Sequence, residues 1–245
     1  MDDSEKLFIK DIYIDWNEVE RGSYLRDIAS LRALSHLPLH CPVTFFCGEN
    51  GTGKSTLLEA IAVACGFNPE GGTINYAFTT KDTHSALYQA LRLSRSWRKN
   101  RTGYFLRAES FYNVATMEEE YAKGPGGVEH HYHEKSHGES FLALAQDYFR
   151  GDGLYLLDEP EAALSPQRQL SLIIEIMRCV RGGAQFFIAT HSPILMGIPQ
   201  AEILSFDDGT IHAVNYEETD SYRITASFLN GRERFLRQLL QEDEE

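Results

Sequence analysis

The chain contains 245 residues with a formal net charge of −13, and hydrophobic residues make up 42% of it. That share suits a globular protein with one large core, whereas the negative charge excludes a protein that coats nucleic acid along its whole surface. No run of about 18 apolar residues occurs, so we expect no direct insertion into a membrane. The acidic N-terminus lacks a signal-peptide core, and no Cys-x-x-Cys spacing occurs, which together indicate a cytoplasmic protein with reduced thiols.

The N-terminal region is predicted to hold a strand at 7–16 and a segment with helical spacing at 24–34. Three aromatic residues of this region, Tyr13, Trp16 and Tyr24, are candidates for stacking on an adenine ring. Core packing is the simpler interpretation of each one taken alone.

The next stretch carries the clearest motif of the chain. Residues 48–56 read Gly-Glu-Asn-Gly-Thr-Gly-Lys-Ser-Thr and match the phosphate-loop pattern G-x-x-x-x-G-K-[ST]. An apolar run at 42–47 predicts a buried strand before them, and a helix-forming run at 57–65 follows. Glycines let successive N–H groups point at phosphate oxygens, and the helix dipole faces the same oxygens. We therefore expect a nucleoside triphosphate to bind Gly48, Glu49, Asn50, Gly51, Thr52, Gly53, Lys54, Ser55 and Thr56.

Two side chains of this loop have distinct expected roles. Lys54 would reach the β- and γ-phosphates, and the Ser55 hydroxyl would bind Mg²⁺.

Residues 82–150 are predicted to form a helical lobe inserted in the nucleotide-binding core. A helix over 82–97 runs into a basic block at 92–101, which holds five basic residues and no acidic ones. One interpretation is contact with nucleic-acid phosphates, with Trp97 stacking on a base. The favoured interpretation is a solvated helix end, where cations complement the helix dipole.

The rest of this region contains a predicted strand at 103–108, a helical stretch to about residue 123, a glycine-rich loop and a histidine cluster. The histidines at 130, 131, 133 and 137 suggest a metal site. Adjacent side chains of a loop rarely converge on one ion, and no cysteine lies near, so a metal site is the less favoured interpretation.

The second half alternates helices and apolar strands. Helices are predicted at 138–150, from Pro166 to the glycines at 182–183, and at 231–240. Strands are predicted at 154–157 and 185–189, and a hairpin joins 203–206 to 211–214. Strands that are apolar throughout and alternate with helices indicate an α/β fold with a mainly parallel sheet flanked by helices, organised as one domain over 1–245.

Polar residues follow two of these strands. Asp158 and Glu159 end the strand at 154–157, and His191 follows the strand at 185–189. Parallel strands deliver their carboxyl ends to one sheet edge, where ligands bind. Asp158 would hold Mg²⁺ opposite Ser55, Glu159 would act as general base on the attacking water, and His191 would contact the γ-phosphate.

Five ordered motifs resemble those of an ATP-binding-cassette (ABC) ATPase. They lie at 48–55, 136–140, 156–160, 163–166 and 190–192, and they look like its Walker A, signature, Walker B, D-loop and switch-histidine elements. The Ser-His-Gly-Glu form of the signature and the Thr-His-Ser-Pro run are more similar to the SMC/RecF branch than to transporter subunits. Short stand-alone bacterial predicted ATPases carry the same runs.

The resemblance implies a P-loop NTPase fold, ATP and Mg²⁺ as ligands, and a head-to-tail homodimer with ATP between two copies. Ser136, Gly138 and Glu139 of one copy would then cap the γ-phosphate bound by the other. Two departures from the family pattern stand out: His137 replaces the first glycine of the usual signature, and the usual glutamine before the lobe is not evident. Glu109 holds the equivalent place and would reach Mg²⁺ or the lytic water.

Three functions follow as hypotheses. The favoured one is a Mg²⁺-dependent ATPase that dimerises on ATP and drives or gates an unknown protein partner. The alternative is the ATP-binding subunit of a membrane ABC transporter. A third is a switch in DNA maintenance or defence, for which the block at 92–101 is the local support.

Overall fold

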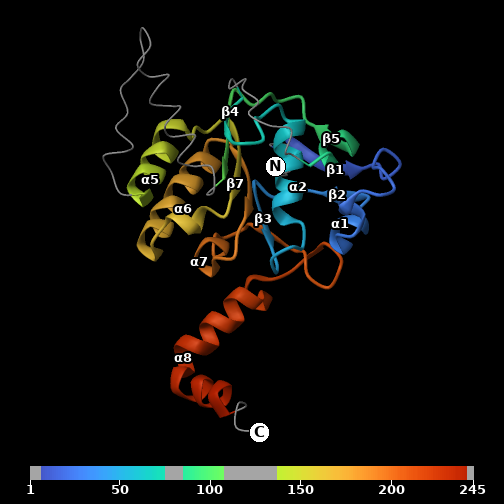
Figure 1. Ribbon diagram of the computed structural model, residues 1–245. Coiled ribbons are helices and arrows are strands. Elements are labelled where there is room, and N and C mark those ends of the chain that lie inside the picture. Colours follow the sequence, from blue (N-terminus) through green and yellow to red (C-terminus); the bar gives the residue numbers. More distant parts are fainter. Residues whose placement is uncertain (1–6, 75–84, 108–136, 242–245) are drawn as a thin grey trace.

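The computed structural model describes residues 7–74, 85–107 and 137–241, and all structural statements below refer to these residues (Figure 1). A sheet with helices on both faces forms the body, and a long C-terminal helix projects away from it. None of the described helices combines the length and the apolar character needed to cross a bilayer.

A seven-stranded sheet organises the body, in the order β10-β9-β3-β8-β7-β6-β4. Its five central strands run parallel, and the short edge strands β4 and β10 are antiparallel to their neighbours. This confirms the predicted mainly parallel sheet. The strands are β3 (Val43–Cys47), β4 (Gly72–Thr73), β6 (Thr102–Arg107), β7 (Gly153–Asp158), β8 (Gln185–Ala189), β9 (Glu202–Ser205) and β10 (His212–Ala213).

The central strands are buried on both faces, which explains why their sequences are continuously apolar. Every residue of β3, β7 and β8 is buried. Alternate side chains of each strand enter two different hydrophobic clusters, so that Phe46 and Phe187 contribute to one and Phe45 and Phe186 to the other. The sheet therefore separates two cores, one on each face.

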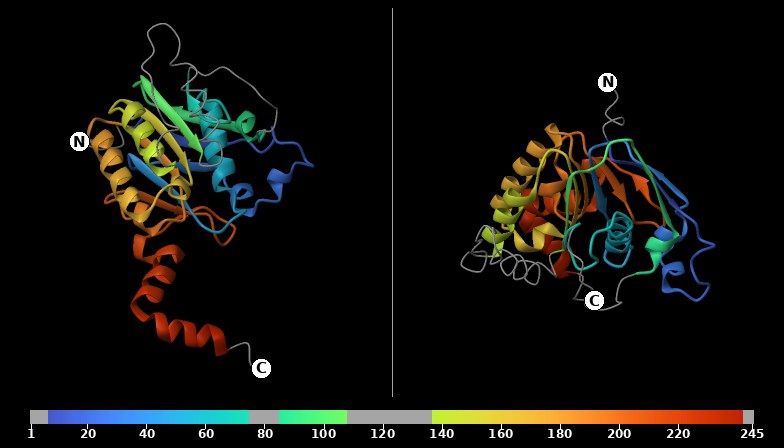
Figure 2. Two further views of the ribbon diagram at one scale, coloured as in Figure 1. Left: turned by 60° about the vertical axis from the view of Figure 1, so that its left-hand side comes forward. Right: turned by 90° about the horizontal axis from the view of Figure 1, so that it is seen from above.

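Helices cover the two faces separately. Helix α2 (Lys54–Ala64) packs on one face, and helices α5 (His137–Tyr148), α6 (Pro166–Arg181) and α7 (Pro193–Met196) pack on the other. Figure 2 shows α2 and α5 on opposite sides of the sheet. Ser165 caps α6, as predicted, because its hydroxyl accepts the N–H of Arg168 and Pro166 occupies the first turn.

A second, three-stranded antiparallel sheet covers α2 and has the order β2-β1-β5. Its strands are β1 (Ile9–Ile14), β2 (His36–Pro38) and β5 (Leu91–Arg95); the 3-10 helix η2 (Tyr24–Arg26) and the short helix α1 (Ala29–Arg32) lie between the first two. The helix predicted over 82–97 is therefore wrong beyond Ala90, because only α3 (Leu87–Ala90) is helical. Leu91 and Leu93 alternate with polar residues, and pairing with β1 buries Leu91 in the core and packs the partly buried Leu93 against it.

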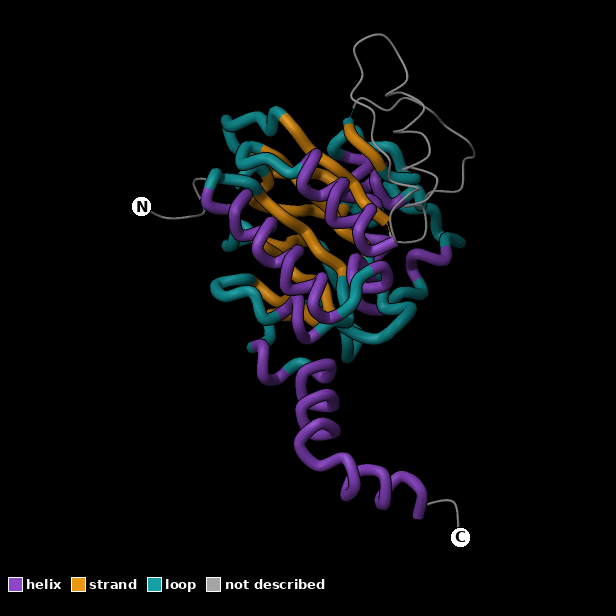
Figure 3. Tube along the Cα trace, turned by 90° about the vertical axis from the view of Figure 1, so that its left-hand side faces the viewer, coloured by secondary structure: helices purple, strands orange, loops and turns teal. Residues whose placement is uncertain are grey.

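The C-terminal region confirms the predicted hairpin, since β9 and β10 pair antiparallel. Two 3-10 helices, η4 (Pro160–Ala163) and η5 (Tyr216–Glu218), connect elements in this half. Helix α8 (Asp220–Gln241) starts well before the predicted residue 231, and Gly231 interrupts it with non-helical backbone angles. The tube view in Figure 3 shows both halves of α8 standing clear of the sheet.

Candidate nucleotide-binding site

The phosphate loop, residues 48–56, joins the carboxyl end of β3 to the first turn of α2. Gly48, Gly51 and Gly53 adopt positive φ values of 130°, 82° and 96°. Glycine adopts such values readily, whereas residues with a side chain rarely do. A Cβ atom on Gly53 would approach Ile28 and Leu31 of the neighbouring helical segment within 3.0 Å. The glycines of the motif therefore shape a loop that also packs closely against the protein.

Lys54 is buried at the base of this loop, with 4% of its surface exposed. Its Nζ donates hydrogen bonds of 2.7 Å to the carbonyl oxygens of Gly48 and Glu49. Burial lowers the pKa of Lys54, while the carboxylates of Glu159 and Asp207 act in the opposite direction. The ammonium group thus lies within the curl of the loop, where phosphate oxygens are expected.

Ser55 and Asp158 are in contact: the Ser55 hydroxyl donates a 2.8 Å hydrogen bond to Asp158 Oδ1. Asp158 ends β7 and is buried. A hydroxyl and a carboxylate are hard oxygen ligands of the kind that Mg²⁺ prefers, and this pair fits the ion together with phosphate oxygens and water. No cluster of three His, Cys, Asp or Glu side chains suited to a metal occurs in the described ranges.

Glu159 and His191 lie side by side beyond the same sheet edge. Glu159 adopts a left-handed backbone conformation with φ 49°, and its N–H donates to Ala189 O at the end of β8. His191 Nε2 lies 4.0 Å from Glu159 Oε1. This nitrogen is shielded from solvent although 38% of the side chain is exposed, and it has no hydrogen-bond partner among the described residues.

Two further carboxylates shape the site, and the sequence motifs indicate neither of them. Glu161 Oε1 accepts the backbone N–H of His191 at 2.6 Å, which fixes the start of the loop after β8. Asp207 Oδ1 accepts the backbone N–H of Glu49 at 2.8 Å, and its Oδ2 accepts the hydroxyl of Ser205 at 3.3 Å. A Cβ atom on Gly48 would lie 2.9 Å from Asp207 Oδ1, so glycine leaves the room for this carboxylate.

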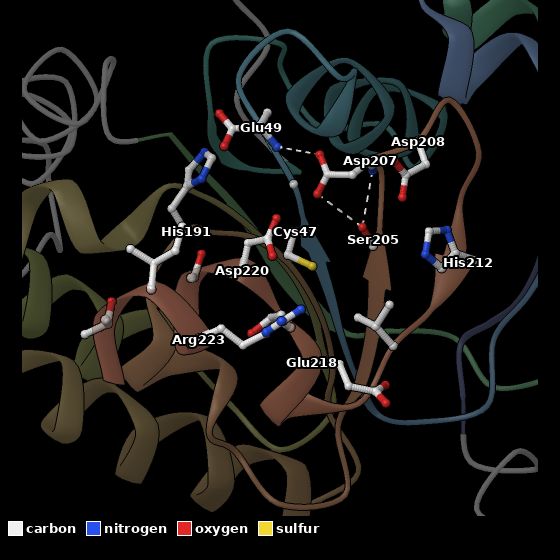
Figure 4. A pocket seen from close by; sticks show the side chains of 16 residues that line it. Cys47, Glu49, His191, Ser205, Asp207, Asp208, His212, Glu218, Asp220 and Arg223 are labelled. Atoms are coloured by element: carbon white, nitrogen blue, oxygen red, sulfur yellow. Dashed lines mark hydrogen bonds between the residues drawn. The ribbon is translucent and has the colours of Figure 1, made fainter. Parts of the chain in front are cut away.

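A cavity of about 420 Å³ opens beside the phosphate loop, and Figure 4 shows the side chains that line it. One wall comes from the loop and the end of β9, and the other comes from the first turns of α8. Polar side chains dominate it, including His191, Asp207, Asp208, His212, Glu218, Asp220 and Arg223. The base of the projecting helix α8 is therefore a neighbour of the phosphate loop.

The described part of the signature motif begins α5. Gly138 is packed so tightly that a Cβ atom would lie 2.8 Å from Ala163 O and 3.0 Å from Arg168 Nη1. Glu139 Oε1 pairs with Arg168 Nη2 at 2.9 Å. Ser136 and Glu109, together with the histidine cluster up to residue 133 and the predicted helix before residue 123, lie outside the described residues.

The three adenine-stacking candidates occupy different surroundings. Tyr13 stacks on His36 with ring centroids 4.4 Å apart, and the indole N–H of Trp16 donates to Leu34 O at 2.8 Å. Tyr24 is the most exposed of the three, with 58% of its surface accessible. Tyr13 and Trp16 therefore have partners within the chain, and Tyr24 exposes the largest share of its surface.

The basic block at 92–101 forms β5 and the loop before β6, at the amino-terminal ends of the parallel strands. This edge lies opposite the phosphate loop. Trp97 is 89% exposed there. The arginines nevertheless contact groups of the chain itself: Arg92 with Asp15 at 3.5 Å, Arg95 with Ala64 O at 2.8 Å, Arg98 over the Phe8 ring, and Arg101 with Asp152 at 4.0 Å. Much of the block's charge therefore serves the fold.

Comparisons with known proteins agree with this fold. Residues 84–197 match the family model described as "AAA domain, putative AbiEii toxin, Type IV TA system", and residues 24–123 match a model described as "AAA domain". No curated protein shows detectable sequence similarity to the chain.

Among solved structures, the chain is similar to cbiO1 from Clostridium perfringens, part of the ABC transporter complex cbiONQ. The TM-score is 0.50 at 14% identity, covering 96% of this chain and 99% of that one. The SMC head domain from Thermotoga maritima is also similar, with a TM-score of 0.45 at 14% identity over 85% of this chain and 98% of that one. With the phosphate loop, Asp158 and His191 placed at one edge of this sheet, the chain has a P-loop α/β fold similar to that of cbiO1, and parts of it match AAA-domain models.

Proposed function

We propose that the chain is a Mg²⁺-dependent ATPase that closes as a head-to-tail homodimer around ATP and drives or gates a protein partner. The observation that carries the proposal is the 2.8 Å hydrogen bond between Ser55 and Asp158. It brings the phosphate loop to the strand end that also supplies Glu159, so a triphosphate, its metal ion and a general base share one place.

Each side chain has a role that its geometry supports. The Lys54 ammonium exchanges its two carbonyl partners for β- and γ-phosphate oxygens. Ser55 and Asp158 would hold Mg²⁺, which would neutralise phosphate charge when bound. Glu159 takes a proton from a water whose oxygen attacks the γ-phosphorus, and the bond to the β-phosphate oxygen breaks to release ADP and phosphate. His191 Nε2 binds a γ-phosphate oxygen.

The arrangement of α2 and α5 supports the homodimer. The phosphate loop begins α2 on one face of the sheet, and the signature residues Gly138 and Glu139 begin α5 on the other. We infer that the signature of a chain serves the phosphate loop of another copy rather than its own. A second copy turned head to tail would supply it.

Replacing Glu159 with Gln tests the proposal. The amide cannot accept the proton from water, so the variant should bind ATP, hydrolyse it at least about 100-fold more slowly and accumulate as a dimer. Light scattering with saturating ATP and Mg²⁺ measures the mass, and Glu217→Gln, an exposed glutamate, is the matched control. A Glu159→Gln protein that binds ATP and stays monomeric contradicts the dimer.

Nucleic-acid control of the ATPase is a second candidate, favoured by the exposure of Trp97. Trp97 lines a cavity of about 440 Å³ with Arg95 and Lys99. An aromatic face beside cations is the arrangement that binds single strands. ATPase activity stimulated by DNA or RNA in the wild type and lost in Trp97→Ala supports it; equal activity with and without nucleic acid contradicts it.

The transporter-subunit alternative makes a different prediction. It requires a membrane protein partner that copurifies with the chain and whose transport depends on Glu159. Finding such a partner would favour the transporter subunit over the stand-alone ATPase.

A further inference from the structure

Arg107 occupies a position that the ATPase chemistry above does not use. It ends β6, and its Nη1 lies 2.8 Å from Glu59 Oε2, while its Nε lies 3.7 Å from Asp158 Oδ2. The exposed fractions of the three side chains are 24% for Arg107, 13% for Glu59 and 10% for Asp158. One largely buried guanidinium is thus shared between two largely buried carboxylates.

The fold fixes this arrangement on both sides. Strands β6 and β7 pair in parallel with Arg107 directly opposite Asp158, so the two side chains project from the same face of the sheet. Glu59 lies one turn after Ser55 on α2, so it is on the side of the helix that covers this face of the sheet. Glu59 Oε1 also accepts the backbone N–H of Ser85 at 2.9 Å, which anchors the carboxylate.

We propose that Arg107 competes with Mg²⁺ for Asp158 and thereby raises the metal concentration that the site requires. This inference rests on the proposed ATPase function. Asp158 Oδ1 faces the Ser55 hydroxyl and Oδ2 faces Arg107. A divalent ion at Ser55 and Asp158 would lie within a few ångströms of the guanidinium, where like charges in a buried site repel strongly.

Glu59 determines how Arg107 responds to the metal. It is the closer of the two partners, so Arg107 can move away from Asp158 and keep a buried counter-ion. Of the two carboxylates Glu59 and Asp158, only Asp158 would stay charged once Glu59 is neutralised. The Arg107 guanidinium would then bind Asp158 more strongly. Neutralising Arg107 and neutralising Glu59 should therefore change metal affinity in opposite directions.

Titration of Mn²⁺, a paramagnetic substitute for Mg²⁺, measures this directly. The protein is kept in excess over a non-hydrolysable ATP analogue, and electron paramagnetic resonance reports free and bound Mn²⁺. Arg107→Met should lower the half-saturating Mn²⁺ concentration about tenfold, and Glu59→Gln should raise it by a similar factor. Arg107→Lys keeps the charge and should stay close to the wild type.

Arg101→Met is the matched control. Arg101 lies just before the first residue of β6, at the opposite end of the strand from Arg107, and its side chain is exposed. It should leave the titration unchanged. A merely structural role of Arg107 would weaken metal binding in both Arg107→Met and Glu59→Gln, and that result overturns the inference. If Arg107→Met does not fold, Arg107→Gln takes its place: a lower half-saturating concentration supports the inference, and an equal or higher one refutes it.

Failure of the proposed function gives a distinct result. A wild-type protein that does not bind the ATP analogue at any metal concentration removes both the ATPase proposal and this inference. A wild type that binds and hydrolyses ATP, with Arg107→Met and Glu59→Gln shifted in the same direction, removes the inference alone.

Discussion

Ser55 Oγ donates a 2.8 Å hydrogen bond to Asp158 Oδ1, although the two residues are 103 positions apart in the chain. This contact joins the first turn of α2 to the end of β7. It places the hydroxyl and the carboxylate that suit Mg²⁺ beside the loop that suits phosphate. The metal requirement of the proposed reaction therefore depends on this pair.

Replacing Asp158 with Asn should lower ATP hydrolysis at least about 100-fold, because a neutral amide cannot stabilise the metal ion on which phosphate charge depends. Chelation of Mg²⁺ should stop hydrolysis in the wild type, and added Mg²⁺ should restore it. Phosphate release measures both effects. Asp152→Asn, a change at a partly exposed aspartate, should retain activity. Full activity of Asp158→Asn would refute the assignment of the metal site.

Asp207 is predicted to hold the phosphate loop in shape through the backbone N–H of Glu49. Asp207→Ala removes the acceptor of that N–H, and a hydrogen bond of this kind contributes about 0.5–1.5 kcal/mol, so the affinity for a fluorescent ATP analogue should fall about two- to tenfold. Asp207→Asn retains an acceptor oxygen and should bind more tightly than Asp207→Ala. Equal affinities for Asp207→Ala and the wild type would exclude this role.

The sequence alone was sufficient to place at one sheet edge those site residues that follow strands. Asp158 and His191 come directly after continuously apolar runs, and parallel strands bring such ends together. The roles of Arg107 and Asp207 were not predictable, because each depends on a partner brought close only by tertiary packing. The left-handed conformation of Glu159 likewise has no local signal, since few residues other than glycine adopt it.

The helix predicted over 82–97, which is wrong beyond Ala90, has a similar explanation. Its apolar residues fit a helical spacing, yet Leu91 and Leu93 also fit the period of two that a strand requires. Pairing with β1 and burial against α2 decide in favour of the strand, and neither is visible in a local window. Local pattern and tertiary pairing compete in this segment, and pairing wins.

The thiols of Cys47 and Cys65 should react slowly in the folded protein. Burial is the main cause that raises the pKa of each thiol to about 11, and near Cys47 the Asp207 carboxylate adds to it. At pH 8 the thiolate fraction is then about 100-fold smaller than for a thiol of pKa 9, and thiolate is the reactive form. Modification by a disulfide reagent, compared between folded and denatured protein, measures the difference. Equal rates would show that the two thiols are accessible and ionised.

The same shifts predict how stability changes in alkaline solution. The folded state favours the protonated thiols, so their contribution is fully present below the unfolded pKa of 9 and is lost as pH rises through about 11. Urea unfolding at pH 8 and pH 10.5 should show a larger loss of stability in the wild type than in Cys47→Ala. An identical loss in both proteins would contradict the assignment.

Gly138 lies in the first turn of α5, the helix that the proposed dimer presents to a second copy, and its lack of a side chain is predicted to be essential. In Gly138→Ala the new Cβ would lie 2.8 Å from Ala163 O, a backbone atom of the turn after Glu159. Either α5 or that turn must shift, and overpacking of this kind costs about 1–3 kcal/mol. We expect Gly138→Ala to unfold at lower urea concentration and to lose ATP-dependent dimerisation. Gly22→Ala, where no atom lies within 4 Å of the new Cβ, is the control and should match the wild type. A Gly138→Ala protein with unchanged stability and dimerisation would show that close approach at this helix start is not required.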